Sequence, residues 1–364
     1  MSGGEESSSS SYTWQQKWDA IAPKPFALLS IFCSAYIIKH ILSNQTRRRQ
    51  VVHHIILGLS LHDLIYAISM FLGTWPIPRG TPNVYLASGT DQTCTAQAFF
   101  QQVAIACPLY STALAIYYLL VGSYGWKEHK LKKYEFVLFH FIPNAVGFAT
   151  AVVGLAKRDY GNATLWCWIA DPDDRLIYGY AVIWACMLAM IVIMATMYWK
   201  VLSQERKVEK YRFRIAKARG ANNTVRSEET DATTATEKSY QKQREQVSAS
   251  RKVANQAAFW IGAFLLSFIF GFLLRLFQNN RSVVPDSLYC LMTIFTPLQG
   301  FFNALVYFRP IYLSRHPDSN FCRYVCGCDL LLWIINIIRK RVFGESNKAE
   351  AVQQSCTPPS AANL

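Results

Sequence analysis

Charged side chains are scarce in this chain, so those that interrupt its apolar stretches are the first candidates for chemistry. The 364 residues are 52% hydrophobic and 16% charged, whereas soluble domains carry roughly 25% charged residues. Asp63 interrupts LSLHDLIYAIS (59–69), and Arg275 interrupts FLLRLFQNN (272–280). A lone charge within an apolar layer is costly, so such a residue usually has a partner or a function. Asp63 is therefore a candidate buried acid, and Arg275 a candidate anchor for an anionic group.

Long apolar runs must position these side chains. A run of about 18 or more apolar residues can cross a membrane, because a helix rises about 1.5 Å per residue and the apolar layer is about 30 Å thick. The sequence predicts seven such spans, at 22–42, 51–75, 94–121, 134–156, 176–202, 253–277 and 287–308. We therefore expect an all-α membrane protein in which residues 22–310 form a bundle of seven transmembrane helices.

Basic residues are distributed unevenly among the loops and predict the orientation of the bundle. Arg47–Arg49 lie between the first two spans, four lysines lie within 127–133, and the loop 203–252 is strongly basic. The positive-inside rule places these loops in the cytoplasm. A short tail, 1–21, is then extracellular and the tail 311–364 cytoplasmic. The net charge of +14 belongs mostly to the cytoplasmic face and does not predict nucleic-acid binding.

Sites of modification follow from this orientation. The sequons at Asn162 (NAT) and Asn280 (NRS) fall in extracellular loops and are expected to be glycosylated. Matching sequences at Asn44 and Asn222 fall on the cytoplasmic side and are expected to stay unmodified.

The tail after the last span is expected to form an interfacial helix. Its apolar run Leu330–Ile338 follows three cysteines that are candidates for lipidation, Cys322, Cys326 and Cys328. A zinc site that used the nearby His316 would lack the usual ligand spacing, so we expect no metal.

Two other cysteines could form a covalent link on the extracellular side. Cys94 opens the third span at its outer end, and Cys167 lies between Trp166 and Trp168 in the loop after the fourth span. An extracellular location permits a disulfide, which would hold this loop over the mouth of the bundle. The alternative is a pair of free thiols.

Several runs together resemble a known receptor family. WCWI (166–169), with a cysteine opening the third span and a long basic third inner loop, resembles a G-protein-coupled receptor. The more specific similarity is to the cAMP-receptor-like family, related to the secretin class, and is carried by 59–69, CTAQAFFQQ (94–102), 272–280 and LQGFFNALVYF (298–308). The resemblance implies a multi-pass plasma-membrane receptor that activates a heterotrimeric G protein and is neither an enzyme nor dependent on a cofactor.

The sequence departs from the secretin class in two places. About 20 residues precede the first span and none is cysteine, so a large peptide hormone is not expected as ligand. His53 resembles the histidine of the inner lock of that class, but the late third span, YYLLVGSYGW (117–126), offers no acid. The lock is therefore expected to be absent or rebuilt.

A polar network inside the bundle is expected to change between receptor states. Asn303 in the seventh span is the expected partner of Asp63, and we include His53 and Tyr307 as further candidates for this switch network. The alternative is a protonated, hydrogen-bonded Asp63 without a switching role.

The ligand pocket is expected to open on the extracellular side beneath the loop that carries Cys167. Its candidate residues are Gln97, Gln101, Trp168, Tyr178, Trp184 and Arg275. An arginine among amides and aromatic rings suits a small polar or anionic ligand. Arg275 could instead extend to lipid headgroups at the membrane surface.

Rival classes of seven-span protein leave different signatures. A small-solute transporter is the main alternative, and it predicts internal repeats with broken helices at matching places. No convincing repeat is present, although Pro108, Pro143 and Pro297 could kink their spans. A retinal protein needs a lysine in the last span, and 287–308 contains none. The expected partners are thus a G protein, a small ligand and membrane lipids, which basic helix ends bind.

Overall fold

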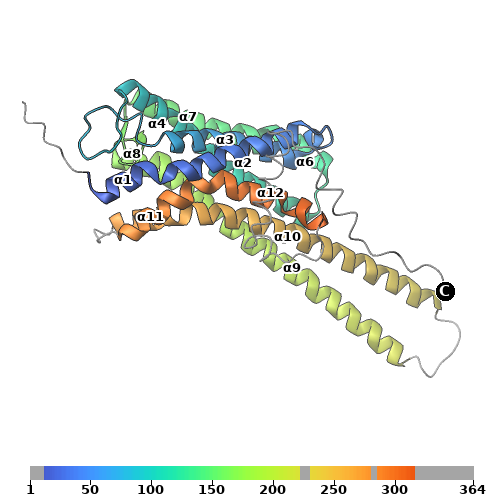
Figure 1. The fold of residues 1–364 in the computed structure, drawn as a ribbon. Coiled ribbons are helices and arrows are strands. Elements are labelled where there is room, and N and C mark those ends of the chain that lie inside the picture. Colours follow the sequence, from blue (N-terminus) through green and yellow to red (C-terminus); the bar gives the residue numbers. More distant parts are fainter. Residues whose placement is uncertain (1–11, 222–229, 280–284, 316–364) are drawn as a thin grey trace, which may run out of the picture. The chain divides into compact units, whose positions relative to one another are not determined.

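Residues 12–221, 230–279 and 285–315 are described by the computed structural model, and helices make up most of them (Figure 1). Within these residues, seven helical stretches are long and apolar enough to cross a membrane. In order, spans one to seven are Trp14–Leu42, Val51–Leu72, Asp91–Tyr124, Glu128–Ala156, Pro172–Lys210, Ser239–Gln278 and Asp286–Ser314. The predicted seven-helix bundle is confirmed, and each stretch overlaps the span predicted at its place in the sequence.

The first three spans begin where side chains can close a helix end. Their helices are α1 (Trp14–Ile21) and α2 (Pro23–Leu42), α3 (Val51–Leu72) after the 3-10 turn η1 (Arg47–Arg49), and α4 (Asp91–Val103) with α5 (Ala106–Tyr124). The Thr13 hydroxyl accepts from the Gln16 N–H at 3.3 Å, and the Gln16 side chain accepts from the Thr13 N–H at 2.9 Å. This capping box lets the first helix begin before the predicted residue 22.

The fourth and fifth spans each contain a wider, π-helical turn. The fourth consists of α6 (Glu128–Tyr134), the π-helix η2 (Glu135–Phe141) and α7 (Ile142–Ala156). The fifth consists of α8 (Pro172–Arg175), the π-helix η3 (Leu176–Tyr180) and α9 (Ala181–Ala221). Such π-helical turns often occur at functional sites.

The last two spans differ in regularity. The sixth lies within the long helix α10 (Thr230–Asn279), whereas the seventh is divided into α11 (Asp286–Phe295), the 3-10 turn η5 (Thr296–Leu298) and α12 (Gln299–Arg315). The chain forms two compact units, one ending at Val306 and one beginning at Tyr307.

A short antiparallel hairpin joins the fourth and fifth spans. Its strands are β1 (Tyr160–Asn162) and β2 (Cys167–Ile169), and Asn162 pairs with Cys167. The Tyr160 hydroxyl donates to the Ala151 carbonyl at 2.8 Å, and burial raises the pKa of this phenol. The hairpin is thereby attached to the end of the fourth span.

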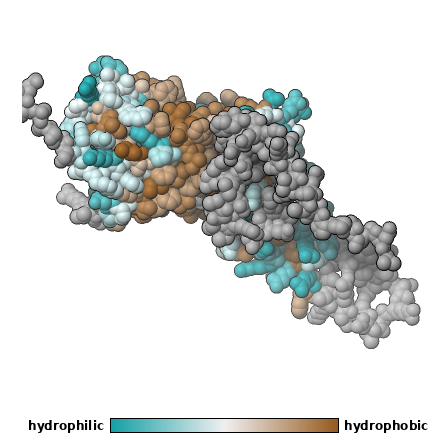
Figure 2. Space-filling model, in the orientation of Figure 1, coloured by the Kyte–Doolittle hydropathy of each residue, from teal (hydrophilic) through white to brown (hydrophobic). Residues whose placement is uncertain are grey.

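Helix α5 lies at the centre of the bundle, where it packs against α3, α9 and α10. An apolar cluster at this contact contains Ala115, Met190 and Phe264. Large apolar side chains are also exposed on the outside, and Trp199 is 75% exposed. Figure 2 shows apolar residues across the middle of the bundle and hydrophilic residues at the end that carries α8. This pattern suits a protein whose sides face lipid.

Candidate functional site

The predicted disulfide between Cys94 and Cys167 is confirmed. It joins the start of α4 to strand β2 across 73 residues of sequence, with the two Cα atoms 5.3 Å apart. Both cysteines are buried, beside Ile77 and Ala98. The link fixes the hairpin at one end of the bundle, called the disulfide end below.

Gln97 fastens the same hairpin by hydrogen bonds. Its side-chain nitrogen donates to the carbonyls of Ser69 and Gly73, each at 2.9 Å, and its Oε1 accepts from the Cys167 N–H at 2.9 Å. These bonds connect the second span, the third span and β2. The polar atoms of Gln97 are engaged in these three hydrogen bonds, and Gln97 is not among the residues that line the cavity described next, so its role in a ligand pocket stays a prediction.

A narrow cavity of about 70 Å³ lies beneath the hairpin. Aromatic rings from seven residues contribute to its walls, together with aliphatic side chains and a few polar groups. The lining residues include Tyr66, Gln101, Cys107, Trp166, Trp168, Tyr180, Trp184, Phe268, Phe272, Arg275, Thr296 and Gln299. Four of the predicted pocket residues line it, namely Gln101, Trp168, Trp184 and Arg275.

Tyr178 does not line the cavity. Its carbonyl accepts from the Gln102 side chain at 3.0 Å, and its ring lies 5.3 Å from the Lys157 ammonium. Lys157 also forms an ion pair with Asp174, and this hydrogen-bonded contact raises the pKa of Lys157. Tyr178, which lies in the π-helix η3, therefore contacts Gln102 and Lys157 and not the cavity.

Gln102 positions Trp168, although it was not among the candidate pocket residues predicted from the sequence. The Trp168 indole N–H donates to Gln102 Oε1 at 2.7 Å, and the Trp168 ring meets Tyr180 edge-on at 5.1 Å between centroids. A Cβ atom at Gly179 would lie 2.6 Å from the Trp168 ring, so only glycine fits there. The sequence does contain a signal, because two glutamines are adjacent at 101–102, but only Gln101 was taken as a candidate.

Arg275 faces the cavity with its charge only partly compensated. Its guanidinium lies over the Tyr180 ring at 4.6 Å, and Nη1 donates to Gln278 Oε1 at 2.6 Å. Gln278 in turn donates to the Tyr289 hydroxyl at 2.8 Å. No described carboxylate forms an ion pair with Arg275. A stacked guanidinium of this kind retains donors that can hold an anionic group.

Asp63 and Asn303 are in contact inside the bundle. Asn303 Nδ2 donates to Asp63 Oδ2 at 2.7 Å, and each residue is only 1% exposed. The Cys107 thiol interacts with the same carboxyl group and also lines the cavity. Tyr307, in the second unit, is buried and packs edge-on against Phe308 at 4.8 Å. Whether any of these residues switches state stays a prediction.

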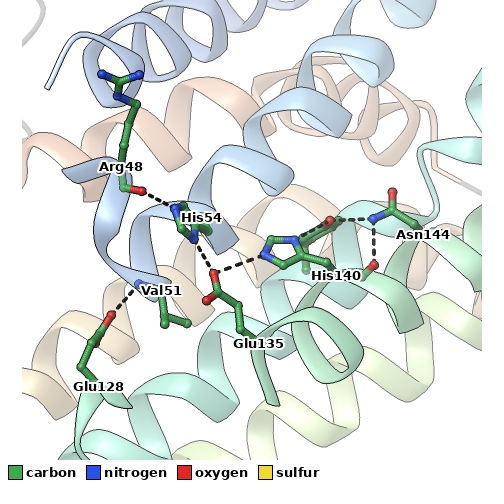
Figure 3. Close-up of polar contacts among 8 residues, drawn as sticks. Arg48, Val51, His54, Glu128, Glu135, His140 and Asn144 are labelled. Atoms are coloured by element: carbon green, nitrogen blue, oxygen red, sulfur yellow. Dashed lines mark hydrogen bonds and ion pairs between the residues drawn. The ribbon is translucent and has the colours of Figure 1, made fainter. Parts of the chain in front are cut away.

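A histidine–carboxylate cluster occupies the other end of the bundle, called the basic end because it carries Arg47–Arg49 (Figure 3). Glu135 forms an ion pair with His54 Nδ1 and lies 3.9 Å from His140 Nε2. His54 Nε2 lies 2.5 Å from the Arg48 carbonyl. Both ring nitrogens of His54 thus face acceptor oxygens, an arrangement that the imidazolium form satisfies fully.

The cluster continues into the third and fourth spans. His140 Nδ1 lies 3.1 Å from the Tyr110 hydroxyl, and Asn144 donates to that hydroxyl at 2.8 Å. At its edge, Glu128 Oε1 accepts from the Val51 N–H at 2.6 Å and so closes the start of α3. The cluster links α3, α5, α7 and the π-helix η2.

The cluster contains a histidine–carboxylate contact next to the position at which an inner lock was considered. His53 resembles the histidine of that lock, and because the late third span offers no acid, we expected the lock to be absent or rebuilt. The next residue, His54, makes the acid contact, and Glu135 of the fourth span supplies the carboxylate. The sequence contains no signal for this contact, because Glu135 and His140 are five residues apart and share a face only in a π-helix such as η2.

The predicted modification sites are only partly covered by the described residues. Asn162 is exposed on β1, and its side-chain oxygen accepts from the Thr164 N–H at 2.8 Å. Asn280 lies outside the described residues, as do three lipidation candidates, Cys322, Cys326 and Cys328.

Comparison with known proteins finds relatives named as receptors. No protein-family model matches the chain. It is 25% identical over 195 residues to ascaroside receptor GPR3 of Arthrobotrys oligospora, covering 53% of this chain and 48% of that protein. It is 24% identical over 189 residues to ascaroside receptor GPR2 of the same fungus, covering 51% and 44%. The chain spans about half the length of these curated relatives, and neither name refers to the cAMP-receptor-like family, so that resemblance stays a prediction.

Proposed function

We propose that this chain is a plasma-membrane receptor that binds a small extracellular ligand in the cavity beneath the disulfide-anchored hairpin and activates a heterotrimeric G protein. The observation that carries the proposal is the aromatic cavity with Arg275 in its wall and no described carboxylate paired to it. The names of the two relatives support a receptor role. In this proposal the disulfide end faces outward and the basic end faces the cytoplasm, as the distribution of basic residues favours.

Signalling would follow from a difference in affinity between two packings of the bundle. A ligand shifts the equilibrium toward the packing that it binds more tightly. Cys107 lines the cavity and interacts with Asp63, so ligand contacts act next to the Asp63–Asn303 pair. The His54–Glu135 contact at the basic end opposes separation of the second and fourth spans there. The basic extensions of α9 and α10 would face the G protein and anionic lipid.

A nucleotide-exchange assay tests this function. The full chain is expressed with a panel of G proteins, and guanine-nucleotide exchange is measured while ascarosides, chosen because of the relatives' names, and small organic anions are added. We expect at least one compound to raise exchange in the wild type but not in Arg275→Gln at equal surface level. Uptake of labelled compound into vesicles, with no exchange response from any G protein, would favour the small-solute transporter instead.

A further inference from the structure

Two glutamine side chains in the cavity wall have polar atoms without a partner. Gln299 is 1% exposed, and among the described residues neither Oε1 nor Nε2 has a hydrogen-bond partner. Gln101 is 5% exposed, and its Oε1 also has none. Both residues line the cavity. Buried polar atoms in folded proteins are nearly always hydrogen-bonded, so a cluster of unpaired ones calls for an explanation.

The backbone around Gln299 is held firmly in place. Pro297 lacks an N–H and interrupts the seventh span as the 3-10 turn η5. The Ser30 hydroxyl donates to the Pro297 carbonyl at 2.6 Å and accepts from the Phe301 N–H at 3.3 Å. A Cβ atom at Gly300 would meet Ser34, so α2 and α12 approach closely there. The backbone position of Gln299 is thus fixed by these contacts, so we do not expect a shift of the helix to pair its side-chain atoms.

The polar groups of the cavity occur at different depths. Arg275 lies near the disulfide end, where its partner Gln278 bonds to Tyr289. Gln299 lies ten residues beyond Tyr289 along the seventh span, which corresponds to about 15 Å of helical rise. Aromatic side chains line the space between, including Trp184, Phe268 and Phe272. The cavity therefore has a cationic group toward the disulfide end, an apolar middle and amides farther from that end.

We propose that Gln101 and Gln299 form a second recognition point, which binds a hydroxyl or amide group at the far end of a ligand whose anionic group is held by Arg275. This inference rests on the proposed function and adds the chemical class of the ligand. An amide side chain offers both a donor and an acceptor, so the matching group must accept and donate at once. The small volume, about 70 Å³, favours a slim unbranched chain between the two ends over a bulky ring system.

This position also places the far end of the ligand next to the candidate switch. Tyr66 lines the cavity and interacts with the Gln101 side chain. Cys107 lines it as well and interacts with Asp63. A ligand that reaches the amides therefore contacts residues adjoining the Asp63–Asn303 pair, whereas a ligand held at Arg275 alone does not. Full activation is accordingly expected only from ligands that carry both polar ends.

The test compares two matched series of small molecules on the purified full chain. One series consists of straight-chain carboxylates of increasing length, and the other of the same acids with a terminal hydroxyl group. Binding is measured as the rise in melting temperature at equal concentrations. At the best length we expect the hydroxy acid to bind the wild type about ten-fold more tightly than the plain acid, since it gains hydrogen bonds to buried groups.

Variants separate this inference from the proposed function. In Gln299→Leu the preference for the hydroxy acid should vanish while the plain acid still binds. In Arg275→Gln neither acid should raise the melting temperature. Without ligand, Gln299→Leu should melt at or above the wild-type temperature, because it removes unpaired buried atoms. If Gln299→Leu does not fold, Gln101→Met provides the same comparison.

The contrary results separate a failure of the second recognition point from a failure of the anionic pocket. Equal binding of the two acids to the wild type, or a preference that survives in Gln299→Leu, would overturn the second recognition point and leave the pocket intact. If no acid binds at any length, or if binding persists unchanged in Arg275→Gln, then the anionic pocket fails and the inference fails with it.

Discussion

At the scale of single residues, Asp63 and Arg275 are two charges in apolar surroundings with different neighbours. Asp63 is buried against Asn303, whereas Arg275 has an aromatic ring and an amide but no described carboxylate. A charge inside an apolar run is a strong signal, so both residues could be found from the sequence. Gln299 could not, because an uncharged amide in a span looks the same whether or not its atoms are paired.

Loss of the disulfide should lower surface expression to the same extent in both of its single cysteine variants. Cys94→Ala and Cys167→Ala each remove the same link, which closes a loop of 73 residues and stabilises the fold by about 4 kcal/mol in the chain-entropy estimate. Surface expression should fall in each single variant, and the double variant should be no worse than either. Losses that add up, or no loss at all, would contradict a stabilising role for the link.

Asp63→Asn should separate folding from signalling. The substituted amide oxygen can still accept from Asn303 Nδ2, which now lies 2.7 Å from the Asp63 carboxylate. Folding is therefore expected to be normal, while basal or ligand-driven exchange shifts because the buried charge is gone. The measurement is nucleotide exchange at matched surface level. Unchanged exchange would reduce Asp63 to a structural role.

Arg275→Lys distinguishes an anion site from a headgroup contact. Lysine keeps the charge but loses the planar fork and the stacking on Tyr180. An anion site predicts about a ten- to hundred-fold loss of ligand potency, measured as a dose–response curve with any agonist found. Arg79→Lys, at an exposed loop position, is the matched control and should leave potency unchanged. If ligand potency is the same in Arg275→Lys as in the wild type, the side chain contacts lipid headgroups and does not bind the ligand.

At the scale of elements, three prolines mark where the spans depart from regular helix. Pro108 follows the break between α4 and α5, Pro143 follows the π-helix η2, and Pro297 lies in the turn η5. Proline removes a donor and clashes with the carbonyl four residues earlier, so the kinks were predictable from the sequence. The type of turn was not, and it decides which side chains face inward. The π-helix η2 brings Glu135 to His54 and His140, and hydropathy carries no trace of that register.

The His54–Glu135 contact should restrain the basic end of the bundle. Glu135→Gln removes the charge that links α3 to η2, and His54→Asn removes its partner. Each is expected to raise basal nucleotide exchange, and their effects should not add, because they break one interaction with a coupling energy of about 0.5–3 kcal/mol. Asn144→Ala, which loses the bond to Tyr110 but keeps the ion pair, is the control. Additive effects of the two variants would show that the contact does not act as a unit.

At the scale of the whole molecule, the sequence was sufficient for the spans and insufficient for the cavity. Length and hydropathy determine which residues can cross a membrane, so the seven spans were predictable even though the first begins earlier than expected, at Trp14. The cavity depends on how side chains from several spans pack. Gln97, Gln101 and Gln102 are close in sequence, yet one supports the hairpin, one faces the cavity and one positions Trp168. These three roles depend on contacts with other spans and with the hairpin, which the sequence of one span cannot predict.

The orientation of the whole chain can be tested through its sequons. Asn162 is exposed on the hairpin at the disulfide end, whereas Asn44 lies at the basic end, where its Oδ1 accepts from the Thr46 N–H at 2.9 Å. Glycosylation occurs only on the extracytoplasmic side, so an outward disulfide end predicts a glycan on Asn162 and none on Asn44. Asn162→Gln should abolish one glycosidase-sensitive mobility shift, and Asn44→Gln should change nothing. A glycan on Asn44 would reverse the orientation, and with it both the site of ligand entry and the face offered to a G protein.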